Sequence, residues 1–440
     1  MYIRIKFLMC RQGYILLCLI FSIGVLSGQT TENEIFENIE KTGGVLFAYP
    51  ESEIGNQSMV PKGYKPFYLS HFGRHGSRYL ASDSDYKAVL DEFSNAAHFN
   101  KLTPLGADVL SRMNQIWEEA QGRGGDLSPL GLKQMRSIAE RMHLSYPEIF
   151  EDSLIISARS TLVPRCILSM DAFCEKLKEL NPKHQISREA SNKYMSYLNF
   201  HTKEAVAFRS EINTWRKDLQ EFEKKKIAPE RLMNSLFNDS TYIIKKLNSI
   251  SLMKGLYEIA GGMQNMDLKL SLYDIFTREE LFNLWQCKNY KLYIEYANAG
   301  QNGGIMMPNA KNVLINILDS ANEVIEKKKN GATFRFAHDG NIIPLAMLLH
   351  LDNCYNVSSN PDEYYKAWSD FKVAPMAGNI QIVFFRNKDS GDIIVKFLLH
   401  EKETIIPVIK SELKPPFYRW SEVKQYYESL LEKYNVAVSN

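Results

Sequence analysis

One histidine, His75, lies between Arg74 and Arg78 in the stretch Arg-His-Gly-Ser-Arg, directly after the strand-like segment Phe67–Phe72. Two neighbouring cations repel a further positive charge, so they lower the pKa of the imidazole and keep it neutral. Neutral imidazole is the form that attacks phosphorus, and guanidinium groups bind phosphate oxygens through paired hydrogen bonds. The pattern therefore predicts a phosphoryl-transfer site with His75 as its nucleophile.

A second pair of reactive residues, His338 and Asp339, lies between a strand-like segment and the apolar helical run 342–351. A strand-to-helix junction lies at the carboxyl edge of a sheet, where the helix N-terminus favours anions. A carboxyl group there could protonate a leaving oxygen. Alone, a His-Asp dipeptide is more often a helix cap with a satisfied histidine, so this pair gains weight only through His75.

Two further arginines, Arg159 and Arg165, follow another strand-like segment in the run Ser-Ala-Arg-Ser-Thr-Leu-Val-Pro-Arg-Cys. Both could point toward the same edge of the sheet. A surface salt bridge is the alternative role for each of them. Upstream, Ser128 followed by Pro129 predicts the start of a helix, and that structural role suffices to explain the segment.

The elements that position these residues are those of an α/β fold. The predicted strands are rich in β-branched and aromatic residues. They are Phe67–Phe72, Leu154–Ser157, Thr333–Ala337, Ile380–Phe385 and Ile393–Leu399. Strands that alternate with helices predict a central mixed sheet flanked by helices, with ligands bound at the carboxyl edge.

Between about 190 and 330 the sequence becomes long, charged and helical in its periodicity. We expect this stretch to form an inserted, mainly helical cap over the edge of the sheet. The predicted division is an α/β core in 29–185 and 331–440, with the cap in 186–330. No internal repeat or low-complexity tract interrupts it.

The stretch 1–28 has the layout of a secretory signal peptide. Arg4, Lys6 and Arg11 precede a short apolar segment that ends in Ser-Gly-Gln. This layout favours a cleaved signal over a single membrane anchor, and Cys18 does not stand where a lipoprotein would be cleaved. We expect a soluble exported protein, periplasmic or extracellular, without a stable membrane span.

Composition sets further bounds. The 440 residues are 45% hydrophobic and 24% charged, as in an ordinary globular protein. Without 1–28, 50 of the 53 basic residues remain against 51 acidic ones, so the global charge predicts no nucleic-acid partner. Four cysteines also remain, and in an oxidising compartment they could pair in three ways, with free buried thiols as the alternative. They are Cys166, Cys174, Cys287 and Cys354.

Two other kinds of site do not fit the sequence. The nine histidines show no His-Glu-x-x-His or similar ligand pair, so we expect no metal site. The glycines in 121–125 fit neither phosphate-loop pattern, so we expect no bound nucleotide. No cofactor is expected, because fixed cations can neutralise the charge on a transferring phosphoryl group.

Four segments, in this order, resemble the histidine acid phosphatase family, which is branch 2 of the histidine phosphatase superfamily. They are Arg-His-Gly-x-Arg at 74–78, a Leu-Thr-x-x-Gly-x-x-Gln-like segment at 127–134, Arg-Ser-Thr-x-x-x-Arg at 159–165 and the late His-Asp at 338–339. The resemblance covers both flanks and much of the chain after the signal.

Within that family the chain looks closest to the multiple inositol polyphosphate phosphatases. The narrower similarity rests on Arg78-Tyr79, Lys193-Tyr194-Met195, Phe200-His201 and Pro344-Leu345. The chain departs from the usual pattern of these enzymes, where His-Ala-Glu commonly replaces His-Asp.

The resemblance implies a role for each matched residue. His75 becomes transiently phosphorylated, while Asp339 protonates the leaving alcohol and then activates water. The phosphate oxygens are held by Arg74, Arg78, Arg165 and His338. Candidate residues for further phosphates of a polyphosphorylated ligand, each of which is otherwise a solvated charge, are Arg159, Arg188, Lys193, Lys203 and Arg209.

We therefore expect a metal-independent phosphomonoesterase that hydrolyses inositol polyphosphates through a phosphohistidine. The first alternative is a broad-specificity histidine acid phosphatase. A phosphomutase would also use an Arg-His-Gly motif, but an exported chain with a late His-Asp suits hydrolysis better. A non-catalytic secreted anion-binding protein would lack a catalytic group, whereas a nucleophile, clamps and a candidate acid are all present here.

Overall fold

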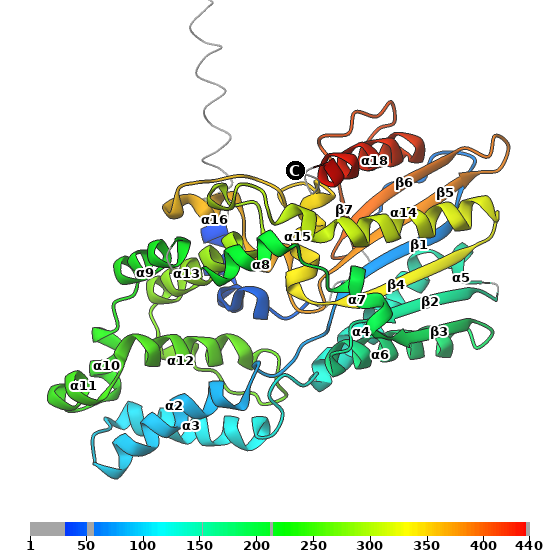
Figure 1. Cartoon of the computed structure of the whole chain (residues 1–440). Coiled ribbons are helices and arrows are strands. Elements are labelled where there is room, and N and C mark those ends of the chain that lie inside the picture. Colours follow the sequence, from blue (N-terminus) through cyan, green and yellow to red (C-terminus); the bar gives the residue numbers. More distant parts are fainter. Residues whose placement is uncertain (1–30, 51–56, 152, 212–213, 437–440) are drawn as a thin grey trace, which may run out of the picture.

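The computed structural model describes residues 31–50, 57–151, 153–211 and 214–436, so the predicted signal peptide lies outside the described residues. One mixed sheet of eight strands has the order β3-β2-β4-β1-β5-β6-β7, with β8 paired to β6 (Figure 1). The strands are β1 (Tyr64–Arg74), β2 (Ile155–Ser160), β3 (Gln185–Ala190), β4 (Gly331–Ala337), β5 (Asn379–Asn387), β6 (Ile393–Leu399), β7 (Lys402–Thr404) and β8 (Phe417–Arg419).

The α/β fold with a central mixed sheet is the predicted one, and all five predicted strands are present, as β1, β2, β4, β5 and β6. Strand β3 was not predicted. It forms the edge of the sheet and is largely exposed, so its sequence lacks the apolar alternation that marks a half-buried strand. Strands β7 and β8 have three residues each, too few to show a period.

Strands β1, β2 and β4 run parallel, so their carboxyl ends meet at one edge of the sheet. Arg74 at the end of β1 pairs with Ala337 at the end of β4, and Ser160 at the end of β2 pairs with Phe336. Because β4 lies between β2 and β1, the residues that follow these three strands come together from distant parts of the sequence.

Helices flank the sheet on both sides. Helices α4 and α6 share one hydrophobic cluster with the strands, while α14 and α15 contact β1 (Figure 1). The α-helices that precede the stretch 186–330 are α2 (Asp83–His98), α3 (Pro104–Ala120), α4 (Pro129–Ser145), α5 (Pro147–Phe150) and α6 (Pro164–Leu180).

The stretch 186–330 is mainly helical, as predicted. Its α-helices are α7 (Asn192–Leu198), α8 (Lys203–Ser210), α9 (Trp215–Lys226), α10 (Glu230–Leu236), α11 (Ser240–Lys246), α12 (Ser249–Met263), α13 (Arg278–Tyr296) and α14 (Lys311–Glu326). The later ones are α15 (Asp339–Leu348), α16 (Tyr364–Ala367), α17 (Asp370–Val373) and α18 (Trp420–Val436). The short 3-10 helices are η1 (Ile39–Leu46), η2 (Tyr273–Ile275), η3 (Gly300–Asn302), η4 (Met307–Ala310) and η5 (Pro361–Glu363).

The helical part of the molecule draws on two stretches of chain. Helices α2 and α3, from the first predicted core segment, pack against α12 and α10, and Figure 1 shows them together at a distance from the sheet. Conversely, β3 belongs to the sheet and α14 contacts β1. The predicted cap range 186–330 thus includes most of a sheet strand and one sheet-flanking helix, while 83–120 joins the helical part from outside that range.

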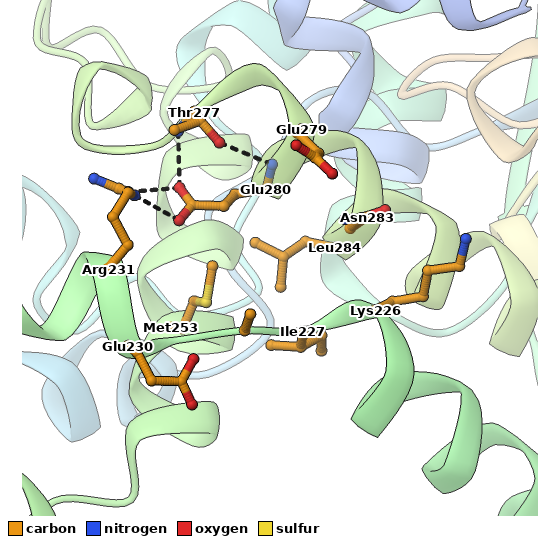
Figure 2. A pocket seen from close by; sticks show the side chains of 11 residues that line it. Lys226, Ile227, Glu230, Arg231, Met253, Thr277, Glu279, Glu280, Asn283 and Leu284 are labelled. Carbon is orange, nitrogen blue, oxygen red and sulfur yellow. Dashed lines mark hydrogen bonds and ion pairs between the residues drawn. The ribbon is translucent and has the colours of Figure 1, made fainter.

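A pocket of about 470 Å³ lies in this helical part, between the α9–α10 connection, α12 and α13 (Figure 2). Ile227, Met253 and Leu284 supply apolar lining. Arg231 donates to the carboxylate of Glu280. The same carboxylate accepts a hydrogen bond from the backbone N–H of Thr277 at the start of α13. None of the residues predicted to do chemistry lines this pocket.

The four cysteines of the described chain are buried and free, so the alternative of free thiols is the one found. Cys166 and Cys174 lie on one helix, α6. Among the helices of the described ranges, none combines the length and the apolarity needed to span a membrane.

Candidate active site

His75 is the first residue after β1, and only 2% of its surface is exposed. Its N–H donates to the carbonyl oxygen of Ala337 (3.0 Å), and its own carbonyl accepts from Ala377 (2.9 Å). The ring nitrogen Nδ1 lies 2.9 Å from the carbonyl oxygen of Gly76. Because a carbonyl oxygen only accepts hydrogen bonds, Nδ1 carries the proton. In the neutral ring Nε2 then keeps a lone pair for nucleophilic attack.

Burial and three arginines keep this ring neutral. Burial has the largest effect and lowers the pKa of His75 well below 6.5, and the charges of Arg74, Arg165 and Arg78 lower it further. The sequence argument named two of these cations. Burial, the larger cause, belongs to the tertiary structure.

The neutral state of His75 can be tested by titration. In protein labelled with ¹³C-histidine, we expect the ring resonance of His75 to keep its neutral shift from about pH 7.5 to about pH 5, whereas an ordinary histidine titrates near about 6.5. His75→Ala assigns the resonance, and the same measurement in urea provides the ordinary midpoint. A midpoint near about 6.5 in the folded protein would contradict this account.

Arg74, the last residue of β1, is fully buried and held on several sides. Its Nη1 donates to the carbonyl oxygens of Val45 (2.5 Å) and Ala374 (2.7 Å), and its Nη2 donates to Asp339 Oδ2 (3.0 Å). Its Nε has no partner among the described residues. Burial lowers the pKa of Arg74 to about 10, which still leaves the guanidinium charged at neutral pH. Arg74 is therefore a fixed positive charge beside His75 and Asp339.

Asp339 is the first residue of α15, and 32% of its side chain is exposed. Its Oδ2 accepts from Arg74, and its Oδ1 accepts from the N–H of Gly340 (2.8 Å). Burial raises the pKa of Asp339, but the charges of Arg74 and Arg78 outweigh it and bring the net value below 3.8. The carboxyl is thus ionised without a ligand, and an anion bound beside it would raise its pKa and favour protonation.

A side chain at the position two residues after His338 would displace the ring of Tyr296. An ideal Cβ on Gly340 would lie 2.9 Å from Cε1 of Tyr296, whose ring packs against the start of α15. In the His-Ala-Glu pattern the acid stands at this position. The packing of Tyr296 therefore leaves Asp339 as the acid at this strand-to-helix junction.

His338 is the N-cap residue of α15, and its ring lies edge-on to that of His75 with 5.7 Å between the ring centroids. Its Nε2 lies 3.1 Å from Thr161 Oγ1, and its Nδ1 lies 3.7 Å from Cys166 Sγ. Burial, followed by the charge of Arg165, lowers the pKa of His338 to about 4, so this ring is also neutral. Thr161 and Cys166 were not predicted as site residues, although both lie within or beside the Arg-Ser-Thr segment.

Arg78 and Arg165 supply further positive charge, and neither forms an ion pair with an acid of the described residues. Arg78 Nη1 donates to the carbonyl oxygen of Tyr79 (2.7 Å), and Arg165 Nη1 lies 3.4 Å from that of Gly125. The Nε atoms of both are buried without a partner. Burial, and then the charge of Arg78, lowers the pKa of Arg165. Two guanidinium groups with open donors therefore lie within electrostatic range of each other.

Two of the candidates for further phosphates, Arg159 and Lys193, gather around one aromatic ring. Arg159 Nε lies 3.3 Å from Glu189 Oε2, and its guanidinium lies 4.4 Å from the ring centroid of Tyr194. Lys193 Nζ lies 5.7 Å from the same centroid. Within the described chain no contact joins either side chain to His75. Their role as substrate-binding residues stays a prediction.

The segment that begins α4 also positions the motif around His75. The carbonyl oxygen of Ser77 accepts from the N–H (2.9 Å) and Oγ (3.1 Å) of Ser128, and the N–H of Ser77 donates to Gln134 Oε1 (2.9 Å). Gly131 comes so close that a Cβ there would lie 2.2 Å from Ser77 O. The sequence assigned this segment only the start of a helix, and its contacts with Ser77 were missed.

This close approach predicts a large effect of Gly131→Ala. The new Cβ would press on backbone, so we expect a loss of about 2 kcal/mol in the free energy of unfolding, together with reduced activity. Urea unfolding measures the free energy of unfolding, and phosphate release measures the activity. Gly331→Ala is the matched control, because its Cβ would meet no atom closer than 3.7 Å. Equal stability of the two variants would contradict the tight packing at Gly131.

The edge of the sheet thus brings together the six residues to which the sequence assigns catalysis and binding of the transferred phosphate: Arg74, His75, Arg78, Arg165, His338 and Asp339. They combine a neutral nucleophile, several cations and one carboxyl group, which are the parts that phosphoryl transfer needs. No group of three His, Cys, Asp or Glu side chains within the described ranges has the arrangement of a metal site.

Comparisons with known proteins lead to the same family. The model of the histidine phosphatase superfamily (branch 2) matches residues 72–400. The multiple inositol polyphosphate phosphatase of Bifidobacterium longum, solved with inositol hexasulfate, has a similar fold with a TM-score of 0.74 at 17% identity, covering 88% of this chain and 97% of that chain. The phytase from D. castellii follows with a TM-score of 0.66 at 14% identity, covering 89% and 85%.

A phytase of Hafnia alvei has a TM-score of 0.51 at 13% identity, covering 84% of this chain and 98% of that one. A search of curated protein sequences found no match. At these identities the solved structures establish a shared fold. The family model, however, extends from the end of β1 past His338 and Asp339 and spans most of the chain. The protein therefore belongs to the histidine phosphatase superfamily, branch 2.

Proposed function

We propose that this protein is an exported phosphomonoesterase that hydrolyses inositol polyphosphates through a phosphohistidine intermediate. One observation carries the proposal: the buried His75 presents a neutral ring whose Nε2 has the lone pair, beside three arginines and one carboxyl group. A nucleophile, fixed cations and a proton donor are together sufficient for phosphoryl transfer.

In the proposed first step, Nε2 of His75 attacks the phosphorus of the bound ester. A bond from nitrogen to phosphorus forms, the bond from phosphorus to the ester oxygen breaks, and the leaving oxygen takes the proton of Asp339. Arg78 and Arg165, which lack acidic partners in the described chain, neutralise the charge on the phosphoryl oxygens. The fixed positive charge of Arg74 favours the carboxylate that Asp339 becomes.

In the second step, water attacks the phosphohistidine. Asp339, now a carboxylate, accepts a proton from this water, the nitrogen–phosphorus bond breaks, and inorganic phosphate leaves. His75 regains its lone pair, and Asp339 regains its proton. The cycle consumes one water molecule for each ester bond.

The substrate class is supported by the fold. The B. longum phosphatase was solved with inositol hexasulfate and a phytase of Hafnia alvei with myo-inositol hexakis sulphate, in which sulfate groups stand in for phosphate groups. Export is supported by the signal-like layout of 1–28.

Phosphate release by the purified protein tests the function. With a chelator present, inositol hexakisphosphate and p-nitrophenyl phosphate are compared at equal concentration. We expect release from both, with a clear preference in kcat/KM for the inositol substrate. Activity on the small ester alone would support a broad-specificity phosphatase, and no activity on either would support a non-catalytic anion-binding protein.

A further inference from the structure

Arg209, in the last turn of α8, has a positive charge that no described acid neutralises through an ion pair. Its guanidinium lies over the ring of Tyr296, 5.0 Å from the centroid. The buried acid in its neighbourhood, Glu295, lies 3.9 Å from a different arginine, Arg216. Arg209 is half-buried. Its guanidinium is therefore positioned by the ring of Tyr296 and remains free to bind an anion.

Helix α8 is anchored against α15, the helix that begins with Asp339. Ala205 on α8 and Met347 on α15 share a small hydrophobic cluster with Met306, and Phe208 packs on it. At the start of α8, the N–H of Thr202 donates to Asn309 Oδ1 (2.8 Å). Figure 1 shows α8 beside α15. The backbone that carries Arg209 is thus fixed relative to α15.

Tyr296 links Arg209 to the candidate active site. Its ring packs so tightly against Gly340 that a Cβ there would lie 2.9 Å away, and Gly340 directly follows Asp339. Burial raises the pKa of Tyr296, the charge of Arg209 lowers it, and that of Asp339 raises it. Both charged groups therefore lie within electrostatic range of the same phenol.

A neutral histidine adds to this surface. His201, just before α8, has a buried Nδ1 without a hydrogen-bond partner in the described chain. Burial, and then the charge of Arg209, lowers the pKa of His201 to about 4. His201 is therefore a neutral polar group near Arg209 and adds no second charge of its own.

We propose that Arg209 determines specificity by binding a second phosphate group of the substrate, one that is not transferred to His75. A leaving oxygen at Asp339 would bring the rest of the ligand close to that carboxyl, and Tyr296 connects this position to Arg209 through its contacts with Gly340 and with the guanidinium. On a polyphosphorylated ring an anionic group is present there, and a guanidinium can bind it with paired hydrogen bonds. This inference rests on the proposed function.

Two substitutions test Arg209: Arg209→Gln removes the positive charge, and Arg209→Lys keeps the charge but removes the paired donors of the guanidinium. Lys217→Gln, at an exposed position on α9, is the control for the change in net charge. Each is assayed with inositol hexakisphosphate and p-nitrophenyl phosphate. Each is also inhibited with inositol hexasulfate and, separately, with inorganic phosphate. The inhibitors report binding even where turnover is slow.

In Arg209→Gln we expect the ratio of KM for the hexakisphosphate to KM for the small ester to rise about tenfold or more, because a hydrogen bond between charged groups is lost. The inhibition constant of the hexasulfate divided by that of inorganic phosphate should rise by a similar factor. For Arg209→Lys both ratios should lie between those of the wild type and those of Arg209→Gln. For Lys217→Gln both ratios should equal those of the wild type.

An equal loss for both substrates and both inhibitors would overturn the inference and assign Arg209 to packing. Unchanged ratios would overturn it as well. The failure of the proposed function is distinguishable: the wild type would then not hydrolyse the hexakisphosphate. In that case a rise in the inhibitor ratio alone would still support a second anion site at Arg209.

Discussion

Replacing His75 with alanine is expected to abolish phosphate release, with a fall in kcat/KM on the order of 10⁴-fold or more. The variant loses the Nε2 lone pair, and within the described chain only one other imidazole ring, that of His338, lies edge-on to His75. His338 has its Nε2 beside Thr161. Steady-state release from p-nitrophenyl phosphate measures the effect, and acid-quenched labelling with ³²P substrate measures the phosphoenzyme.

The control for this variant is His98→Ala, which removes an exposed histidine at the end of α2. It should keep wild-type activity and a labelled phosphoenzyme, whereas His75→Ala should show neither. Circular dichroism and the unfolding midpoint confirm that both variants fold. A folded His75→Ala protein that still formed phosphoenzyme would show that another residue is the nucleophile.

The second large effect is expected for Asp339→Asn, and it should depend on the leaving group. Release from inositol hexakisphosphate should fall by roughly 10²–10⁴-fold, which is the usual contribution of general acid catalysis. Release from p-nitrophenyl phosphate should fall much less, because nitrophenolate is a stable anion and leaves without a proton. Single-turnover formation of the phosphoenzyme with each substrate measures the difference.

Using two substrates with one variant separates chemistry from structure. Asparagine has one acceptor oxygen, whereas the carboxylate uses one oxygen for Arg74 and the other for Gly340, so part of the loss reflects a displaced Arg74. That part is common to both substrates. The ratio of the two losses therefore isolates proton donation, and equal losses would show that Asp339 acts only by holding Arg74.

The identity of the charged and reactive residues at the candidate site follows from the sequence, whereas Thr161 and Cys166 beside His338 do not. The order arginine, histidine, arginine is local, and so is the placement of His338 and Asp339 between a strand and a helix. The five predicted strands also depend on local patterns of β-branched and aromatic residues. Such signals are readable because each depends on a few neighbouring residues.

What only the tertiary structure decided is how distant segments meet. The position of β4 between β2 and β1 brings His338 to His75, and no local pattern encodes that order. The carbonyl groups that hold Arg74 belong to Val45 in η1 and to Ala374 directly after α17, two residues from opposite ends of the chain. The edge strand β3 was missed because its exposure removes the apolar period.

The same reason applies to the surroundings of Asp339 and of His75. The sequence shows Gly340 after Asp339, but only packing shows that Tyr296, from the end of α13, occupies the space of a side chain there. The depth of burial that keeps His75 neutral is likewise a property of the assembled core. The sequence by itself determined which groups can react. Their charge state, orientation and partners depend on contacts between residues far apart in the chain, and only the fold decides these.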